Sequence, residues 1–125
     1  MAILLDHTIV PARDKLASAK FFAEIFGLSL KPGDGYFAQV QLNDSLTFDF
    51  ADEPEPQSHH YAFHISEAEF DAIYERVKSK GLPYGSGPYN HRDGKIYTPR
   101  GGRGFYFEDP NGHLLEVMTV PETGS

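Results

Sequence analysis

Two histidines and two acids occupy matching places in the two halves of this chain of 125 residues. His7 and His60 each lie at or near the start of a β-prone run, and Asp49 and Glu116 each lie in a later β-prone run. A carboxylate in so apolar a strand needs a partner, because a lone buried charge is costly. A divalent metal held by imidazoles is one such partner, and this donor set suits Zn, Fe, Mn, Ni or Co.

The alternation of side chains along a strand predicts which face each acid takes. Asp49 lies between two phenylalanines, and Glu116 lies between Leu115 and Val117. Because successive side chains of a strand point to opposite faces, both acids are predicted to point away from the apolar core. The sequence therefore predicts one acid in each half of the chain, on the face of its strand opposite the apolar one.

The elements that position these residues are predicted to repeat. In the first half, Asp14 is a plausible N-cap and Gly27 a plausible helix end. The turn signal at 43–45 joins two strands. The predicted elements of this half are a strand at 5–10, a helix from Asp14 to Gly27, a further short strand at 28–30, and strands at 36–42 and 46–51.

The second half repeats this order. Ser66 and Glu69 form a capping box that opens a helix, and Gly81 closes it. The other predicted elements are strands at 60–65, 104–108 and 114–120, with a turn at 109–112. The polar segment 52–58 separates the halves. We therefore predict a single domain over 1–125, with one module at about 3–53 and another at about 59–120.

The second half also carries an insertion. Residues 81–104 hold seven of the twelve glycines, which argues against regular structure there. Long glycine-rich loops beside pockets often act as lids, and an arginine in one could clamp an anion. The alternative is a solvated loop whose charges do nothing. The candidates for a pocket or lid from this region are Tyr97, Arg100 and Arg103, with His64 expected on the pocket wall.

Composition excludes several classes of function. The net charge of −7, from 18 acidic and 11 basic residues, argues against nucleic acid as a partner. The chain has no cysteine, which excludes disulfides and thiolate metal ligands. Its apolar runs fall far short of the roughly 20 residues of a membrane span. With no basic, signal-like N-terminus, a cytoplasmic protein is expected.

Three segments carry a resemblance to a known family: Leu5-Asp-His7, His60-Tyr-Ala-Phe63 and Gly104-Phe-Tyr-Phe-Glu-Asp-Pro-Asn-Gly-His-Leu-Leu-Glu116. Together they resemble the vicinal oxygen chelate superfamily, which includes glyoxalase I, fosfomycin-resistance proteins, extradiol dioxygenases and bleomycin-resistance proteins. The resemblance spans residues 3–120. It implies an α+β fold, in which two βαβββ modules form a curved, half-open barrel of mixed β-sheet around one divalent metal.

The resemblance also implies the ligands. His7, His60 and Glu116 match the family's metal-binding positions. The fourth position falls at or near Asp49, where glyoxalase I has a glutamate. Because aspartate is one methylene shorter, Asp49 is expected either to bind the metal or to accept a hydrogen bond behind it. Tyr106 matches a strand position of the fosfomycin-resistance proteins and joins the pocket candidates.

The function implied is a metal-dependent lyase, dioxygenase or transferase that uses Lewis-acid catalysis on a small oxygen-chelating substrate, for which an anion is one option. Two histidines and a glutamate also match the facial triad of Fe(II) oxygenases, for which His64 or His91 could supply a base. The alternatives are fosfomycin modification and metal-free ligand sequestration of the bleomycin-resistance type. A homodimer is expected, because pairing covers open sheet edges, and His7 could come from the partner.

Overall fold

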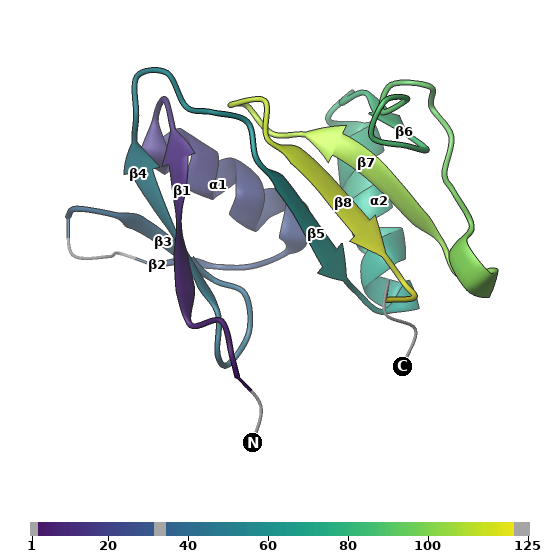
Figure 1. The fold of residues 1–125 in the computed structure, drawn as a ribbon, viewed down its shortest axis with the longest axis horizontal. Helices are drawn as coiled ribbons and strands as arrows, with labels where there is room; N and C mark the ends of the chain where they lie inside the picture. The colour runs from purple at the N-terminus through teal and green to yellow at the C-terminus, as the bar shows by residue number, and fades with distance from the viewer. Residues whose placement is uncertain (1–2, 32–34, 122–125) are drawn as a thin grey trace. The chain divides into compact units, whose positions relative to one another are not determined.

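The computed structural model describes residues 3–31 and 35–121. The chain divides into two compact units, residues 1–57 and 58–125. Each unit has the element order βαβββ, with a helix beside one face of its own four-stranded sheet (Figure 1). The predicted α+β class and the duplication of the βαβββ module are confirmed. The single-domain prediction over 1–125 stays a prediction, and its residues 1–2, 32–34 and 122–125 lie outside the described ones.

The first unit has a mixed sheet in the order β1-β4-β3-β2, in which β1 is parallel to β4 and the other pairs are antiparallel. Its helix contacts all four strands. The elements are β1 (His7–Ala12), α1 (Lys15–Phe26), β2 (Leu30–Lys31), β3 (Ala38–Gln41) and β4 (Thr47–Asp52).

The second unit has the same topology, in the order β5-β8-β7-β6, with β5 parallel to β8. Its helix packs through aromatic side chains on β7. The elements are β5 (His60–His64), α2 (Glu67–Ser79), β6 (Tyr84–Gly85), the 3₁₀ turn η1 (Pro99–Gly101), β7 (Gly104–Glu108) and β8 (Leu114–Met118).

The predicted helix ends are confirmed. The Asp14 side chain accepts the backbone N–H of Ala17, and Gly27 ends α1 with a φ of 70°. Ser66 and Glu69 form the reciprocal capping box of α2. These bonds satisfy backbone N–H groups that a helix leaves unpaired at its start.

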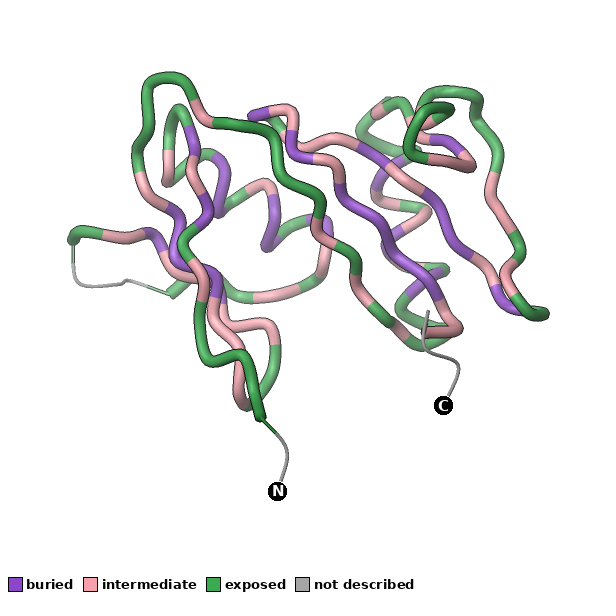
Figure 2. Tube along the Cα trace, in the orientation of Figure 1, coloured by how far each residue is buried: buried purple, intermediate pink, exposed green. Residues whose placement is uncertain are grey.

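The most buried segments include α1, β4 and β8 (Figure 2), and the large apolar side chains of each sheet pack against its helix. In the first unit the Phe22 ring of α1 lies 5.2 Å from that of Phe48 and 6.0 Å from that of Phe50. In the second unit the Phe70 ring of α2 meets that of Phe105 edge to face at 5.4 Å. The helices therefore cover one face of each sheet and leave its other face for the site.

The insertion between α2 and β7 is more regular than its composition predicts, and that expectation was wrong in part. It contains β6, which pairs with β7, and the turn η1. The backbone of Tyr97 also forms a bridge with Gly104. Each of these pairings is too short to produce a strand pattern in the sequence. Among the described residues, no helix is long and apolar enough to cross a membrane.

One charge cluster ties the end of the insertion to α2. The Arg103 guanidinium donates to Glu67 at 2.7 Å and to Asp71 at 2.8 Å, and it lies 4.2 Å from the centre of the Phe70 ring. Hydrogen bonds from Arg103, with a smaller contribution from Thr119, lower the pKa of Glu67. Because Glu67 is exposed, the resulting stabilisation is small.

We expect Glu67→Gln to lower the melting temperature at pH 7 by a few degrees at most. A lowered carboxyl pKa stabilises the folded state above the ordinary pKa of a glutamate, and this contribution is lost as the pH falls through the lowered value. The difference between wild type and variant should therefore shrink between pH 7 and pH 3, as followed by circular dichroism. A difference that stays constant over this range would contradict the assignment.

Candidate metal site and pocket

Several candidate site residues lie on the face of the second sheet that α2 does not cover. In the strand register, Glu116 on β8 is paired with Ala62 on β5 and with Tyr106 on β7. Paired residues share a face, so His60, two positions before Ala62, points to the same side. Leu115, the neighbour of Glu116, is buried on the helix side. The predicted face of Glu116 is confirmed.

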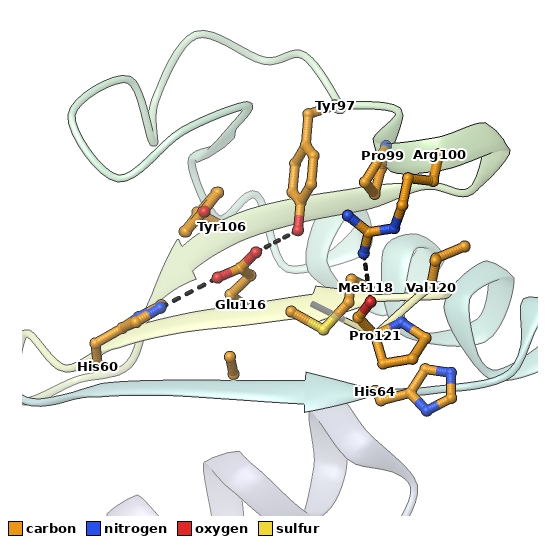
Figure 3. A pocket seen from close by; sticks show the side chains of 11 residues that line it. His60, His64, Tyr97, Pro99, Arg100, Tyr106, Glu116, Met118, Val120 and Pro121 are labelled. Atoms are coloured by element: carbon orange, nitrogen blue, oxygen red, sulfur yellow. Dashed lines mark hydrogen bonds and ion pairs between the residues drawn. The ribbon is translucent and has the colours of Figure 1, made fainter. Parts of the chain in front are cut away.

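His60 and Glu116 are in direct contact, as Figure 3 shows: Nε2 of the imidazole lies 3.1 Å from Oε1 of the carboxylate. The other ring nitrogen, Nδ1, lies 3.0 Å from the carbonyl oxygen of Leu114. A carbonyl oxygen can only accept a hydrogen bond, so this contact suits the tautomer with its proton on Nδ1. With the proton there, Nε2 is the nitrogen that faces the carboxylate, and either a proton or a metal ion between the two atoms would satisfy both.

This donor pair fits a divalent metal. Metal-binding histidines commonly donate their second N–H to a backbone carbonyl, as His60 does to Leu114. Two donors that each bind one ion at about 2.1 Å lie about 3.0–3.4 Å apart at octahedral or tetrahedral angles. The observed 3.1 Å falls in that range. The spacing of these two atoms therefore suits an ion such as Zn²⁺ or Fe²⁺, and it also suits a direct hydrogen bond.

The second carboxylate oxygen of Glu116 is also occupied. The hydroxyl of Tyr97 donates to Oε2, and Glu116 is only 8% exposed. Burial and then the hydrogen bond to Glu116 raise the pKa of Tyr97 well above its ordinary value. The phenol therefore stays protonated at neutral pH and remains a donor. The sequence predicts Tyr97 at the pocket or lid, and it holds no signal for this contact with Glu116.

A pocket of about 580 Å³ opens beside the pair, and the described residues that line it belong to the second unit. Its walls combine aromatic and aliphatic surface with a few polar groups, and the Tyr106 ring stacks on that of His60 at 5.9 Å. The principal lining residues are His60, His64, Tyr97, Arg100, Tyr106 and Met118. Four of the five residues predicted for a pocket or lid are therefore gathered here.

The arginines of the insertion separate into two roles. Arg100 lines the pocket, and its guanidinium donates to the carbonyl of Pro121. It has a φ of 44°, the one positive value for a non-glycine among the described residues. Arg103 does not line this pocket but binds α2. His91, a second candidate base, lies outside it too and contacts Glu108 at 2.5 Å.

The first unit presents an equivalent pair. Asp49 on β4 is paired with Ile9 on β1, as Glu116 is with Ala62, and it is buried at 7% exposure. His7 precedes Ile9 by two positions and so shares the open face with Asp49. The sequence did not suggest that Gln39 donates to Asp49 Oδ1 at 3.0 Å. Only the alternation of residues 36–42 could have placed it on this face.

The His7 ring is exposed and contacts Asp6 through Nδ1 at 2.7 Å. The hydrogen bond to Asp6, with charge contributions from Asp6 and Asp49, raises the pKa of His7. Within residues 3–31 and 35–121, no group of three or more His, Cys, Asp or Glu side chains lies together as a metal site. The first unit places His7 and Asp49 on its open face, and the second places His60, His64 and Glu116 on its own.

Comparison with known proteins decides the family. The family model described as Glyoxalase/Bleomycin resistance protein/Dioxygenase superfamily matches residues 4–117. The chain belongs to this superfamily. The family predicted from the three motifs is thus confirmed, and so is the fold of that family.

Two solved structures are similar to the chain over nearly their full length. Oxidase ChaP-H2 is 47% identical with a TM-score of 0.92, covering 97% of this chain and 96% of that one. Oxidase ChaP-H1 is 43% identical, also with a TM-score of 0.92, covering 98% and 100%. Among curated proteins, the glutathione transferase FosA of Serratia marcescens is 28% identical over 120 residues, covering 90% of this chain and 78% of that protein.

The position of Arg100 predicts a preference among ligands. We expect Arg100→Ala to weaken binding of oxalate or a phosphonate to the metal-loaded protein about tenfold or more, because a charge-assisted hydrogen bond is lost. Neutral catechols should bind almost as before. Arg103→Ala is the matched control, since that guanidinium is paired with α2. Isothermal titration measures both; equal effects of the two variants would contradict a pocket role for Arg100.

Proposed function

We propose that the protein is a metal-dependent oxidase that binds one divalent ion through His7, His60 and Glu116. It acts on a small, oxygen-chelating substrate, with dioxygen as the electron acceptor. The observation that carries the metal site is the contact of His60 Nε2 with the buried carboxylate of Glu116, while Nδ1 lies against the carbonyl oxygen of Leu114. The similarity to two oxidases over nearly the whole chain supports the class of reaction.

The donor count suits this chemistry. Two imidazoles and one carboxylate leave a divalent ion with a net charge of about +1 and with open positions. When bound, the ion would act as a Lewis acid that polarises vicinal oxygens of the substrate. An anionic bidentate oxygen ligand complements that charge. We keep Zn, Fe, Mn, Ni and Co as candidates, with Fe favoured by the facial-triad composition.

The pocket residues of this chain hold and orient the substrate. The rings of Tyr97 and Tyr106 lie 5.6 Å apart and offer apolar faces to a planar molecule, and Met118 adds a polarisable side chain. Arg100 would attract an anionic substituent. His64 is the candidate base in the same pocket; its Nε2 lies 3.2 Å from the carbonyl of Thr119.

His7 is proposed as the third ligand because it occupies the position in the first unit that His60 occupies in the second. The register relates each histidine to its acid in the same way. Asp49 holds the position of Glu116 and is engaged by Gln39. We therefore propose Asp49 as an acceptor that supports the site, because a second coordinating carboxylate would neutralise the ion.

We expect His7→Ala, His60→Ala and Glu116→Ala each to abolish stable metal binding while the fold persists, because these side chains lie on the open faces away from the two cores. Asp49→Ala should have a milder effect. Atomic emission on purified protein gives the metal content, and circular dichroism is the control for folding. Full metal retention in Glu116→Ala would contradict the assignment. Wild-type protein that binds a ligand without metal would support sequestration instead.

A second candidate function is transfer of a thiol to a phosphonate epoxide such as fosfomycin. It is favoured by the relative named glutathione transferase FosA and by Arg100 in the pocket. The two functions differ in the reagent consumed. Consumption of dissolved oxygen that depends on added catechol, measured with an oxygen electrode, supports the oxidase. Loss of glutathione in the presence of fosfomycin and Mn²⁺ supports the transferase.

We also propose that the protein is a homodimer, with His7 supplied to the site by the same or the partner chain. Ile3, Leu5 and Ile9 are large apolar side chains that are more than half exposed near β1. Pairing would cover such surface and the sheet edges. The location of the protein in the cytoplasm stays a prediction.

Light scattering at micromolar concentration should give a particle of twice 14.0 kDa. The shared site adds a second expectation: mixing His7→Ala with Glu116→Ala should restore some metal binding if ligands cross between chains. A particle of 14.0 kDa over this concentration range would contradict the dimer.

A further inference from the structure

The carboxylate of Glu116 divides its two oxygens between different partners. Oε1 faces Nε2 of His60 at 3.1 Å, while Oε2 accepts the hydroxyl of Tyr97 (Figure 3). Tyr97 approaches from the insertion, whereas His60 and Glu116 belong to neighbouring strands. The phenol therefore fixes which oxygen is left for the pocket.

The backbone and the ring of Tyr97 are both held in place. The N–H of Tyr97 donates to the carbonyl of Gly104, and the N–H of Gly104 donates back, each at 2.9 Å. The ring lies against Gly104 so closely that a Cβ there would fall 2.4 Å from Cε1 and Cζ. The first residue of β7 must therefore lack a side chain for the phenol to reach Glu116.

We propose that Tyr97 is a positioning residue for the metal-binding carboxylate: by occupying Oε2 it makes Glu116 bind the ion through Oε1 alone. This inference rests on the proposed metal site. Binding through one oxygen leaves one more coordination position for a bidentate substrate than binding through both. Partners of this kind typically change metal affinity 10–100-fold when removed.

The first test is Tyr97→Phe, which keeps the ring and removes only the hydroxyl. Titration with Co²⁺ should give a dissociation constant about 10–100-fold above that of wild type. The visible Co²⁺ absorption should also change, because Glu116 is free to bind through both oxygens. The control is Tyr89→Phe, which removes the hydroxyl of a fully exposed tyrosine in the same insertion and should match wild type.

The second test is Gly104→Ala, which displaces the phenol without removing it. The atoms that the new Cβ meets are the far end of the Tyr97 side chain, so the ring can yield while the strand pairs as before. We expect the Co²⁺ spectrum of this variant to shift in the same direction as that of Tyr97→Phe. Circular dichroism of the metal-free variants confirms that each is folded.

Three results would overturn the inference. Tyr97→Phe with the affinity and spectrum of wild type would show that the hydroxyl does not position Glu116. A visible Fe³⁺–phenolate band in wild type that disappears in Tyr97→Phe would make Tyr97 a ligand itself. Wild type that binds no Co²⁺ would overturn the proposed metal site as well, and the inference with it. The first two results leave that site standing.

Discussion

The alternation of side chains along β8 is the constraint on which the rest of the second unit depends. Leu115 and Val117 must lie in the core beneath α2, and this requirement places Glu116 on the opposite face. A carboxylate buried there would be costly unless hydrogen-bond donors or a cation met it. Oε1 of Glu116 lies against Nε2 of His60, and Oε2 accepts the hydroxyl of Tyr97. The same packing that stabilises the unit thus produces its candidate site.

The duplication extends this constraint to the first unit with different polar partners. Phe48 and Phe50 lie in the core, and Asp49 is directed to the open face, where Gln39 donates to it. A neutral amide satisfies one oxygen of Asp49, whereas Glu116 faces an imidazole and a phenol. The two halves therefore differ in the groups that surround their acid, and the pocket described above lies in the second.

The features that the sequence predicts correctly are those that depend on neighbouring residues. The caps at Asp14 and Ser66 and the turn at 109–112 depend on residues within four positions, and all are confirmed. The faces of the two acids follow from alternation alone. Strand ends are less exact: the strand predicted at 114–120 ends at Met118, and β3 is shorter than 36–42.

The parts that could not be predicted depend on distant pairings within irregular backbone. Nothing near Tyr97 in the sequence indicates that its ring lies on Gly104 or that its hydroxyl reaches Glu116, 19 positions away. Arg103 and Arg100 are similar in sequence context, yet one binds α2 and the other lines the pocket. The partner of a guanidinium depends on which acids the fold brings near it, and the local sequence does not predict this.

The central claim is that His7, His60 and Glu116 together hold one divalent ion. Anomalous diffraction at the cobalt edge from crystals of the Co²⁺-loaded protein tests it most directly. We predict one strong anomalous peak per chain, bonded to Nε2 of His60, to Oε1 of Glu116 and to the imidazole of His7 from the same or the partner chain. A peak bonded to other residues, or fully loaded protein with no peak at Glu116, would contradict the account.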